Sequence, residues 1–237
     1  GMAEYVRYPK TCVISRVPDE MSLEQAALIE PYGWSKHALD PANISNEDVV
    51  VISGAGTLGL GMITYARMKN PKLLIVLDMQ QNRLDKAKEF GADLVFNPGE
   101  CDIDKEIKAL TDGYEAISRD FPLPQYVTAI YIEATGNPAS VIQGLTIIRK
   151  LGTFVEFSVF GKETTADWSI IGDRKELNIL GSHLSPYAYP FVIENMLKGN
   201  LKTDGVVSHI FKIEEWEKAF DYATGKYGDF KVAFQFD

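Results

Sequence analysis

Cysteine and histidine are scarce in this chain of 237 residues, which contains two cysteines and three histidines. Cys12 and Cys101 lie far apart, form no CxxC pair and have no histidine at a metal-ligand spacing. The sequence therefore predicts neither a disulfide framework nor a cysteine-rich metal site. We interpret the two cysteines as free thiols of a reducing compartment and expect a cytoplasmic protein.

Long apolar runs and an excess of positive charge are also absent. No apolar run reaches the roughly 18 residues of a membrane-spanning helix, and the opening GMAEYVRYPK lacks the apolar core of a signal peptide. The 24 Lys and Arg residues are outnumbered by 33 Asp and Glu residues, which gives a net charge of −9. This balance disfavours binding to nucleic acid or to an anionic membrane. A small molecule is the expected partner.

Short β-branched runs that alternate with helical patterns are the main feature present. Apolar residues make up 46% of the chain and charged residues 24%, which is typical of a globular protein. Strands that are apolar on both faces and separated by helices need a parallel sheet covered on both sides, so the predicted fold is a doubly wound α/β sheet. We expect five strands, at 49–52, 73–77, 94–96, 129–133 and 153–157, and helices at 58–68, 80–90 and 139–150.

The two ends of the chain have a different pattern from this central unit. Residues 5–18 are strand-like, and Ser22 is placed to cap a short helix over 22–29. Further expected elements are a strand at 177–181, helices at 189–197 and 213–223, and a final strand at 231–236.

The segment at about 114–127 does not fit the regular order of strands and helices. Pro122 and Pro124 forbid regular structure, while Phe121, Leu123 and Tyr126 are too apolar for a freely solvated loop. We interpret the segment as an insertion folded back on its own domain. The alternative is an arm that binds a partner.

A glycine motif, Gly54-Ala55-Gly56-Thr57-Leu58-Gly59, follows the first predicted strand and opens the first predicted helix. In this context Gly54 allows a tight turn, and Gly56 lets the backbone approach a pyrophosphate. Gly59 lets the helix pack closely on the strand. The motif predicts a phosphate site at the helix N-terminus.

Asp78 ends the second predicted strand, nineteen residues after Gly59. A carboxylate at that position can accept hydrogen bonds from both hydroxyls of an adenosine ribose. It repels a 2′-phosphate, so NAD is favoured over NADP, although Arg83 could soften this preference. The fold alone does not distinguish a dinucleotide site from an S-adenosylmethionine site, because the latter also uses a glycine turn and an acidic residue at the end of the second strand.

Several segments together carry a resemblance to a known family. Nearly the whole chain resembles the medium-chain dehydrogenase/reductase superfamily, in its zinc-type alcohol and polyol (sorbitol-like) dehydrogenase branch. The segments that carry the resemblance are GMAEYV, AALIEPYGWSKHAL, VVVISGAGTLGLG, DMQQNRLDKAKEFGAD, IYIEATGNP, KELNILGS and EEWEKAFDYATGKYGDFKVAF.

The resemblance implies a set of residues that bind NAD along the ends of the strands. The pyrophosphate would lie at the glycine motif, the adenosine ribose at Asp78 and Arg83, and the nicotinamide near Gly181 and Ser182. The implied cofactor-binding residues are Gly54, Gly56, Thr57, Leu58, Gly59, Asp78, Arg83, Thr135, Gly136, Ser158, Val159, Phe160, Gly181 and Ser182. In this family the strand at 175–181 pairs between subunits, which implies a homodimer or a tetramer.

The chain departs from the family at its start. Relatives begin with a GroES-like catalytic domain whose cysteine, histidine and glutamate residues hold zinc, and that set is not found here. We expect 1–31 to be a remnant of that domain, 32–205 the NAD-binding Rossmann domain and 206–237 a return segment to the catalytic domain. The chain would thus begin late, through a shortened gene or expression of a part.

Glu30 matches the family position of a glutamate at the catalytic zinc, but one carboxylate cannot hold zinc. We therefore expect zinc in the full family and not on this chain. Trp34 occupies a position where relatives usually have a small residue, near the expected nicotinamide end of the cofactor site. It either plugs that site or covers apolar surface that the missing domain leaves bare. His37 is expected to be structural rather than a proton relay.

The expected function is that of an NAD-binding alcohol or polyol dehydrogenase homologue with weak or absent turnover on its own. No catalytic residue and no particular substrate are assigned. One alternative is a non-catalytic NAD-binding or interaction module that engages a partner through Phe121 and Tyr126. A second alternative is an S-adenosylmethionine-dependent methyltransferase.

Overall fold

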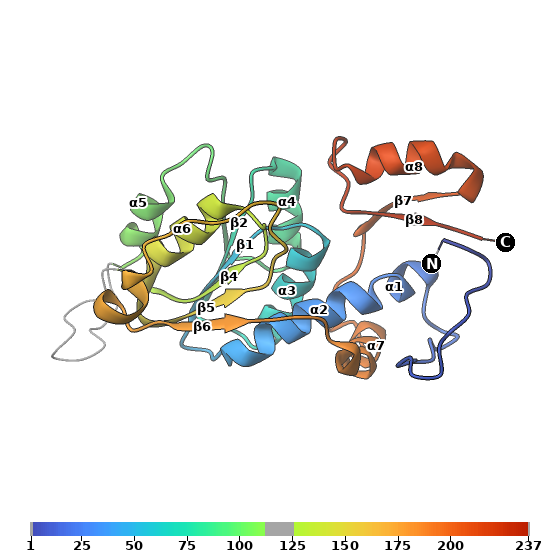
Figure 1. Ribbon diagram of the computed structural model, residues 1–237, viewed down its shortest axis with the longest axis horizontal. Coiled ribbons are helices and arrows are strands. Elements are labelled where there is room, and N and C mark those ends of the chain that lie inside the picture. Colours follow the sequence, from blue (N-terminus) through green and yellow to red (C-terminus); the bar gives the residue numbers. More distant parts are fainter. Residues whose placement is uncertain (1, 112–125, 237) are drawn as a thin grey trace.

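A sheet of six parallel strands forms the centre of the computed structural model, which describes residues 2–111 and 126–236 (Figure 1). This arrangement confirms the predicted doubly wound α/β fold. The order across the sheet is β3 (Leu94–Phe96), β2 (Leu73–Leu77), β1 (Val49–Ser53), β4 (Thr128–Glu133), β5 (Ile148–Glu156) and β6 (Asn178–Gly181).

Helices cover both faces of the sheet (Figure 1). All five residues of β1 are buried. Val50 and Ile52 pack on one side with the first group of helices, while Val49 and Val51 pack on the other. The first face carries α2 (Ile29–Leu39), α3 (Thr57–Met68), α4 (Gln81–Phe90) and α7 (Tyr189–Leu197), and the second carries α5 (Ile103–Ala109) and α6 (Pro138–Ile147).

The strand order reverses between β1 and β4. The chain builds β1, β2 and β3 outward in one direction, then returns to place β4 against the free side of β1. In doubly wound sheets a crevice opens at this point, outside the carboxyl ends of the strands. A ligand site is therefore expected above Ser53 and Glu133, the last residues of β1 and β4.

A smaller unit follows the main sheet. It consists of the parallel strands β7 (Val207–Phe211) and β8 (Lys231–Phe234) with α8 (Trp216–Ala223) between them in the chain (Figure 1). Thr57 Oγ1 donates a hydrogen bond to the carbonyl oxygen of Phe230 at 2.7 Å, and Asn82 Nδ2 donates to that of Gly228 at 2.7 Å. The loop before β8 is thereby attached to the first turns of α3 and α4.

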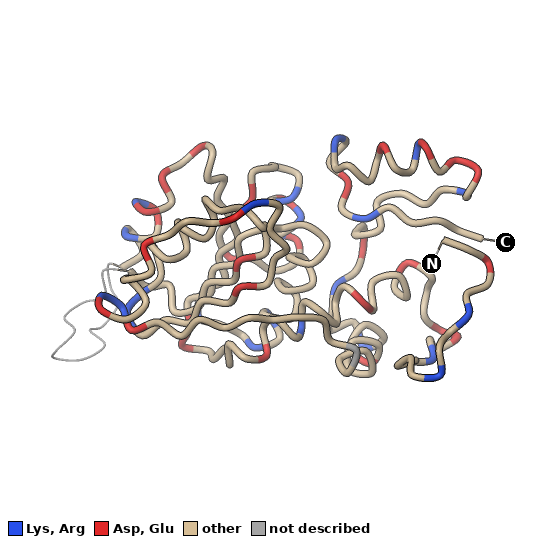
Figure 2. The backbone as a smooth tube through the Cα atoms, in the orientation of Figure 1, with Lys and Arg blue, Asp and Glu red and all other residues tan. Residues whose placement is uncertain are grey.

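Charged residues lie mainly on the outside of both units, with Asp78, Glu133 and Asp229 as buried exceptions. Figure 2 shows Lys and Arg interspersed with Asp and Glu along the outer helices, α8 included, while the central strands carry few charges. In the described ranges 2–111 and 126–236, no helix is long and apolar enough to cross a membrane.

Several predicted elements differ from the structure. Residues 5–18 form no strand, since within the described part of the chain no strand pairs with them. The helix expected over 22–29 is the single turn α1 (Leu23–Ala26), capped by Ser22 as predicted, and α2 starts separately at Ile29. The helix expected to reach residue 150 ends at Ile147, where β5 follows directly.

Further differences occur near the C-terminal end. The strand β7 was not predicted, because its partner β8 lies about twenty residues further along and only its last residue, Phe211, is buried. The remaining short helices are η1 (Asp40–Ala42), the π-helical turn η2 (Ile170–Arg174), η3 (Pro186–Ala188) and η4 (Ile213–Glu215), which precedes α8.

The predicted insertion at about 114–127, with Phe121, lies outside the described residues except for its last two. Tyr126 is buried, and its hydroxyl donates to Asp104 Oδ1 at 2.5 Å. The ammonium groups of Lys108 and Lys175 lie 5.3 and 4.9 Å from the centre of its ring. The hydrogen bond of Tyr126 thus attaches the chain to α5 just before β4 begins.

Candidate functional site

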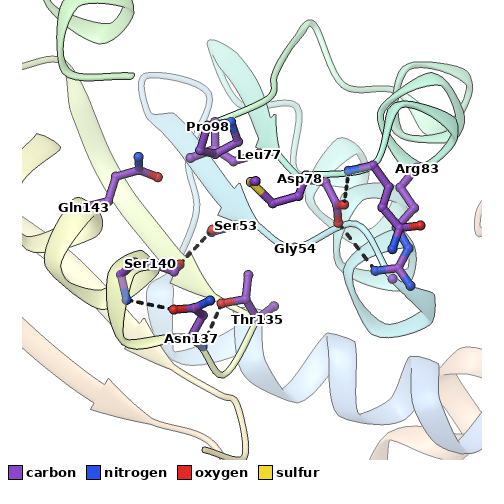
Figure 3. Close-up of a pocket in the computed structure, with 15 residues that line it drawn as sticks. Ser53, Gly54, Leu77, Asp78, Arg83, Pro98, Thr135, Asn137, Ser140 and Gln143 are labelled. Carbon is purple, nitrogen blue, oxygen red and sulfur yellow. Dashed lines mark hydrogen bonds and ion pairs between the residues drawn. The ribbon is translucent and has the colours of Figure 1, made fainter. Parts of the chain in front are cut away.

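A cavity of about 330 Å³ opens at the carboxyl ends of β1, β2 and β4 (Figure 3). Its position is the crevice that the reversal of strand order creates. Five of the residues expected to bind the cofactor line it, namely Gly54, Gly56, Asp78, Arg83 and Thr135.

The glycine turn brings β1 and α3 unusually close together. The φ of Gly54 is +108°, and its N–H donates to the carbonyl oxygen of Leu77 at 2.8 Å. A Cβ at Gly59 would lie 2.0 Å from the carbonyl oxygen of Gly54, so no larger residue fits there. By contrast, the nearest atom to a Cβ at Gly56 is Arg83 Nη1, at 4.0 Å. Gly56 therefore leaves open space in front of the helix.

The first turn of α3 presents backbone N–H groups to this space. The N-cap residue of α3 is Gly56, and no side chain caps the helix. Thr57 and Leu58 follow in the first turn, half-buried. Unpaired N–H groups and the positive end of the helix dipole together favour an anion such as a pyrophosphate.

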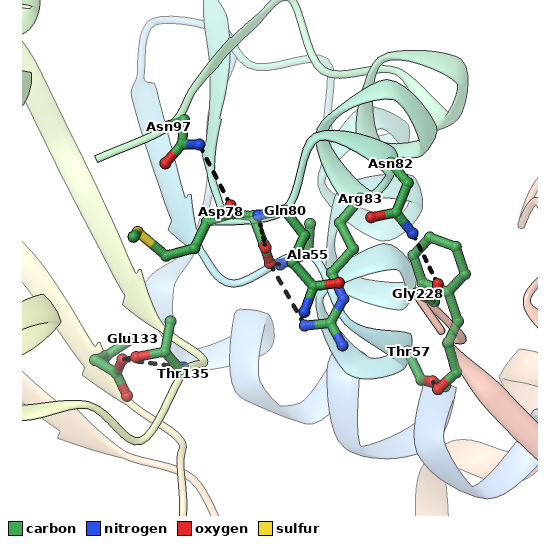
Figure 4. A network of polar contacts seen from close by, with 12 residues as sticks. Ala55, Thr57, Asp78, Gln80, Asn82, Arg83, Asn97, Glu133, Thr135 and Gly228 are labelled. Carbon is green, nitrogen blue, oxygen red and sulfur yellow. Dashed lines mark hydrogen bonds and ion pairs between the residues drawn. The ribbon is translucent and has the colours of Figure 1, made fainter. Parts of the chain in front are cut away.

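Asp78 is fixed at the end of β2 by two backbone donors (Figure 4). Its Oδ2 accepts from the N–H of Ala55 at 2.8 Å and its Oδ1 from the N–H of Gln80 at 2.9 Å. The Nη1 atom of Arg83 lies 3.9 Å from Oδ2. Each carboxylate oxygen can accept a further hydrogen bond, so the pair can receive two hydroxyl groups from the cavity.

Glu133 organises the turn after β4. It is fully buried and accepts from the N–H of Thr135 at 2.9 Å, from the N–H of Gly136 at 3.1 Å and from the Thr135 hydroxyl. The φ of Gly136 is +69°, and a Cβ there would lie 2.5 Å from the carbonyl oxygen of Val159. The turn and the loop after β5 are thus packed directly together.

The loop after β5 and the end of β6 complete this edge of the sheet. Ser158 donates through its hydroxyl to the carbonyl oxygen of Glu133 at 3.2 Å and through its N–H to Glu156 Oε1 at 3.0 Å. Gly181 pairs with Glu156, whose carbonyl oxygen accepts from the N–H of Ser182 at 3.2 Å. Within this loop the side chain of Val159 is exposed, whereas Phe160 packs against the core beside α5 and α6.

The predicted cofactor residues thus form two groups on one crevice. One group surrounds the cavity at β1 and β2, and the other follows β4, β5 and β6. Sequence reasoning missed Glu133 and Glu156, although each is the last residue of a parallel strand, and it missed several cavity residues, some of which lie on α6. The missed cavity residues include Ser53, Gln80, Asn137, Ser140 and Gln143.

Glu156 makes stability depend on pH. Burial and then the charge of Glu133 raise the pKa of Glu156 from 4.5 to about 7. Between these two values the folded state binds more protons than the unfolded state, so the free energy of unfolding falls as pH rises. The fall is about 1–2 kcal/mol after allowance for the half-exposed side chain, and it is complete above pH of about 7.

The variant Glu156→Gln tests this prediction. Urea unfolding at about pH 5 and about pH 8 should show a smaller loss of stability with rising pH in the variant than in the wild type. Equal losses in the two proteins would show that Glu156 titrates normally.

Glu30 belongs to no group of potential zinc ligands among the described residues. Glu30 is exposed in the first turn of α2. The pKa of Tyr189 is raised mainly by the burial of Tyr189 and, to a smaller extent, by the charge of Glu30. Within residues 2–111 and 126–236, no three His, Cys, Asp or Glu side chains gather in a group that could hold a metal ion. His37 is half-buried in α2, and Trp34 packs against Phe157.

Comparisons of sequence identify relatives over almost the whole chain. The family model described as zinc-binding dehydrogenase matches residues 57–198. An erythritol/L-threitol dehydrogenase from Mycolicibacterium smegmatis is 43% identical over 227 residues, which are 95% of this chain and 59% of that protein. A D-arabitol-phosphate dehydrogenase from Enterococcus avium is 30% identical over 225 residues, 93% of this chain and 60% of that protein. The chain thus spans about three fifths of the length of these relatives.

A solved structure shows the same fold. It is described as a short chain alcohol dehydrogenase from E. coli CFT073 complexed with NADH, and it superposes with a TM-score of 0.79 at 23% identity. The match covers 92% of this chain and 61% of that one.

Because these relatives are dehydrogenases, the methyltransferase alternative loses its support. The chain belongs to the zinc-binding dehydrogenase family of the medium-chain dehydrogenase/reductase superfamily.

Proposed function

We propose that this chain is the nucleotide-binding part of an NAD-dependent alcohol or polyol dehydrogenase. The observation that carries the proposal is Asp78, held by the N–H groups of Ala55 and Gln80 at the edge of a cavity that the glycine turn also lines. That arrangement pairs an acceptor for two ribose hydroxyls with a site for phosphate.

Each part of the crevice would hold a different part of NAD. Asp78 and Arg83 would bind the adenosine ribose, and residues 54–59 with the first turn of α3 would bind the pyrophosphate. The turn at 135–136, the loop at 158–160 and Gly181 with Ser182 would flank the nicotinamide half. When bound, NAD supplies the acceptor or donor of a hydride, and the residues named here bind and orient it.

The carboxylate of Asp78 favours NAD over NADP. It lies at the end of β2 with both oxygens already fixed, so a 2′-phosphate would bring like charges together. Arg83 lies 3.9 Å away and offsets only part of this repulsion.

Titration of the wild-type protein with each reduced cofactor tests the proposed function. We expect saturable binding of NADH, with a dissociation constant at least about tenfold lower than that of NADPH, a difference of about 1.4 kcal/mol. Tighter binding of NADPH would contradict the assignment of NAD. Failure of the folded protein to bind either cofactor would contradict the proposed function itself.

The names of the relatives support a small polyol or its phosphate as the substrate class. We further propose that 32–205 is the NAD-binding domain, that 1–31 and 206–237 belong with a catalytic domain, and that the protein acts in the cytoplasm. β6 lies at the edge of the sheet, and Ile179 on it is 39% exposed. An exposed edge strand of this kind supports a homodimer or tetramer formed through 175–181.

A further inference from the structure

Trp34 lies on α2, beside the part of the crevice at the ends of β4 and β5. Its indole meets the ring of Phe157 edge-on, with ring centroids 6.5 Å apart and an angle of 75° between the planes. Phe157 is the first residue after β5, and its N–H donates to the carbonyl oxygen of Glu133 at 3.3 Å. Trp34 therefore lies at the ends of β4 and β5, where the loop at 158–160 begins.

The residues on either side of Trp34 are held in place. The hydroxyl of Ser35 donates to the carbonyl oxygen of Leu58, in the first turn of α3, at 2.7 Å. On the other side, a Cβ at Gly33 would lie 2.9 Å from the ring of Tyr189, so α2 and α7 are in close contact there. The backbone of Trp34 is thus fixed relative to the glycine turn.

The indole itself is only half-buried, although it is a large apolar group. In a doubly wound sheet a dinucleotide extends from the first strands across the reversal of strand order to the strands on the other side. Its adenosine half would start at Asp78, so its nicotinamide half would reach the ends of β4 and β5. Trp34 and Phe157 lie at that end of the path.

We propose that the indole of Trp34 contacts the nicotinamide ring and holds it against the ends of β4 and β5. This inference rests on the proposed function, because it needs a dinucleotide in the crevice. A rigid indole offers a flat apolar surface to an aromatic ring, and it loses little side-chain freedom when the ring binds. Trp34 would then contact the cofactor from α2, whereas the other proposed cofactor residues belong to the glycine motif or follow the strands.

Comparison of NADH with ADP-ribose tests the contact, because ADP-ribose lacks the nicotinamide ring. In Trp34→Ala we expect the dissociation constant of NADH to rise about tenfold and that of ADP-ribose to stay within about twofold of the wild-type value. Trp34→Phe keeps a ring and should recover most of the NADH affinity. Trp216→Ala, which removes a half-exposed tryptophan from α8, serves as the matched control.

The possible results separate this inference from the proposed function. Unchanged NADH binding in a folded Trp34→Ala protein would overturn the contact while leaving the proposed function intact. Equal weakening of NADH and ADP-ribose would also overturn it, since Trp34 would then act through the fold. Tighter NADH binding would show that Trp34 blocks the crevice. Failure of the wild type to bind both ligands would remove the proposed function, and this inference with it.

Energy transfer from tryptophan to NADH provides a second readout. The chain has three tryptophans, Trp34, Trp168 and Trp216. We expect Trp34→Phe to lose a larger share of the NADH emission excited through tryptophan than Trp168→Phe or Trp216→Phe. A loss of emission in saturated Trp34→Phe no larger than the losses in Trp168→Phe and Trp216→Phe would contradict a contact between the indole and the nicotinamide, because the donor in contact with the acceptor transfers most efficiently.

Discussion

Replacing Asp78 with alanine should raise the dissociation constant of NADH by about 30-fold, or about 2 kcal/mol. The variant removes the carboxylate at the end of β2 that two backbone N–H groups hold in place to accept two ribose hydroxyls. Hydrogen bonds to a charged acceptor are stronger than neutral ones. The affinity for NADPH should fall less, because the repulsion of its 2′-phosphate disappears as well. Calorimetric titration with both cofactors measures the two changes.

Asp85→Ala is the control for this experiment. Asp85 lies on α4, where its carboxylate accepts only from the exposed side chain of Gln81 within the described residues. The control should bind NADH as the wild type does. If Asp78→Ala unfolds at the wild-type temperature and binds NADH with unchanged affinity, the ribose does not lie at Asp78.

Replacing Gly59 with alanine should lower the free energy of unfolding by about 3 kcal/mol or more. A methyl group there would lie 2.0 Å from the carbonyl oxygen of Gly54, which belongs to the backbone and cannot rotate away. Either α3 moves away from β1 or the turn distorts, and both changes disturb the buried core between them. Denaturant unfolding with a fixed m-value measures the loss.

Gly161→Ala is the matched control, because no atom of the described residues, apart from Gly161 itself and its chain neighbours, lies within 4 Å of a Cβ at that position. Its free energy of unfolding should stay within about 0.5 kcal/mol of the wild type. A Gly59→Ala protein as stable as this control would show that the glycine turn and α3 are less tightly packed than described.

The glycine turn and Asp78 could be predicted from the sequence because they depend on local chemistry. Gly54 and Gly59 are needed for one turn and one close helix contact, and Asp78 directly ends an apolar strand. The parallel sheet could also be predicted from the sequence, because strands that are apolar on both faces have few other arrangements.

Contacts between distant segments could not be predicted. The approach of Glu133 to Glu156 depends on the register between β4 and β5, which no local pattern specifies. The strand β7 forms only because β8 returns beside it, and 5–18 has a strand-like pattern without a partner among the described residues. The attachment of Gly228 to Asn82 likewise joins positions far apart in the chain.

Titration of NADH into wild-type protein and Gly56→Ala tests the central claim most directly. The φ of −71° and ψ of −170° at Gly56 suit alanine, and the nearest atom to its Cβ would be 4.0 Å away, so the variant should fold normally. The added methyl group would stand where the pyrophosphate approaches the backbone. We expect saturable NADH binding by the wild type and a dissociation constant at least about tenfold higher in Gly56→Ala, or about 1.4 kcal/mol. Equal affinities in two folded proteins, or no binding by the wild type, would contradict a dinucleotide site at this turn.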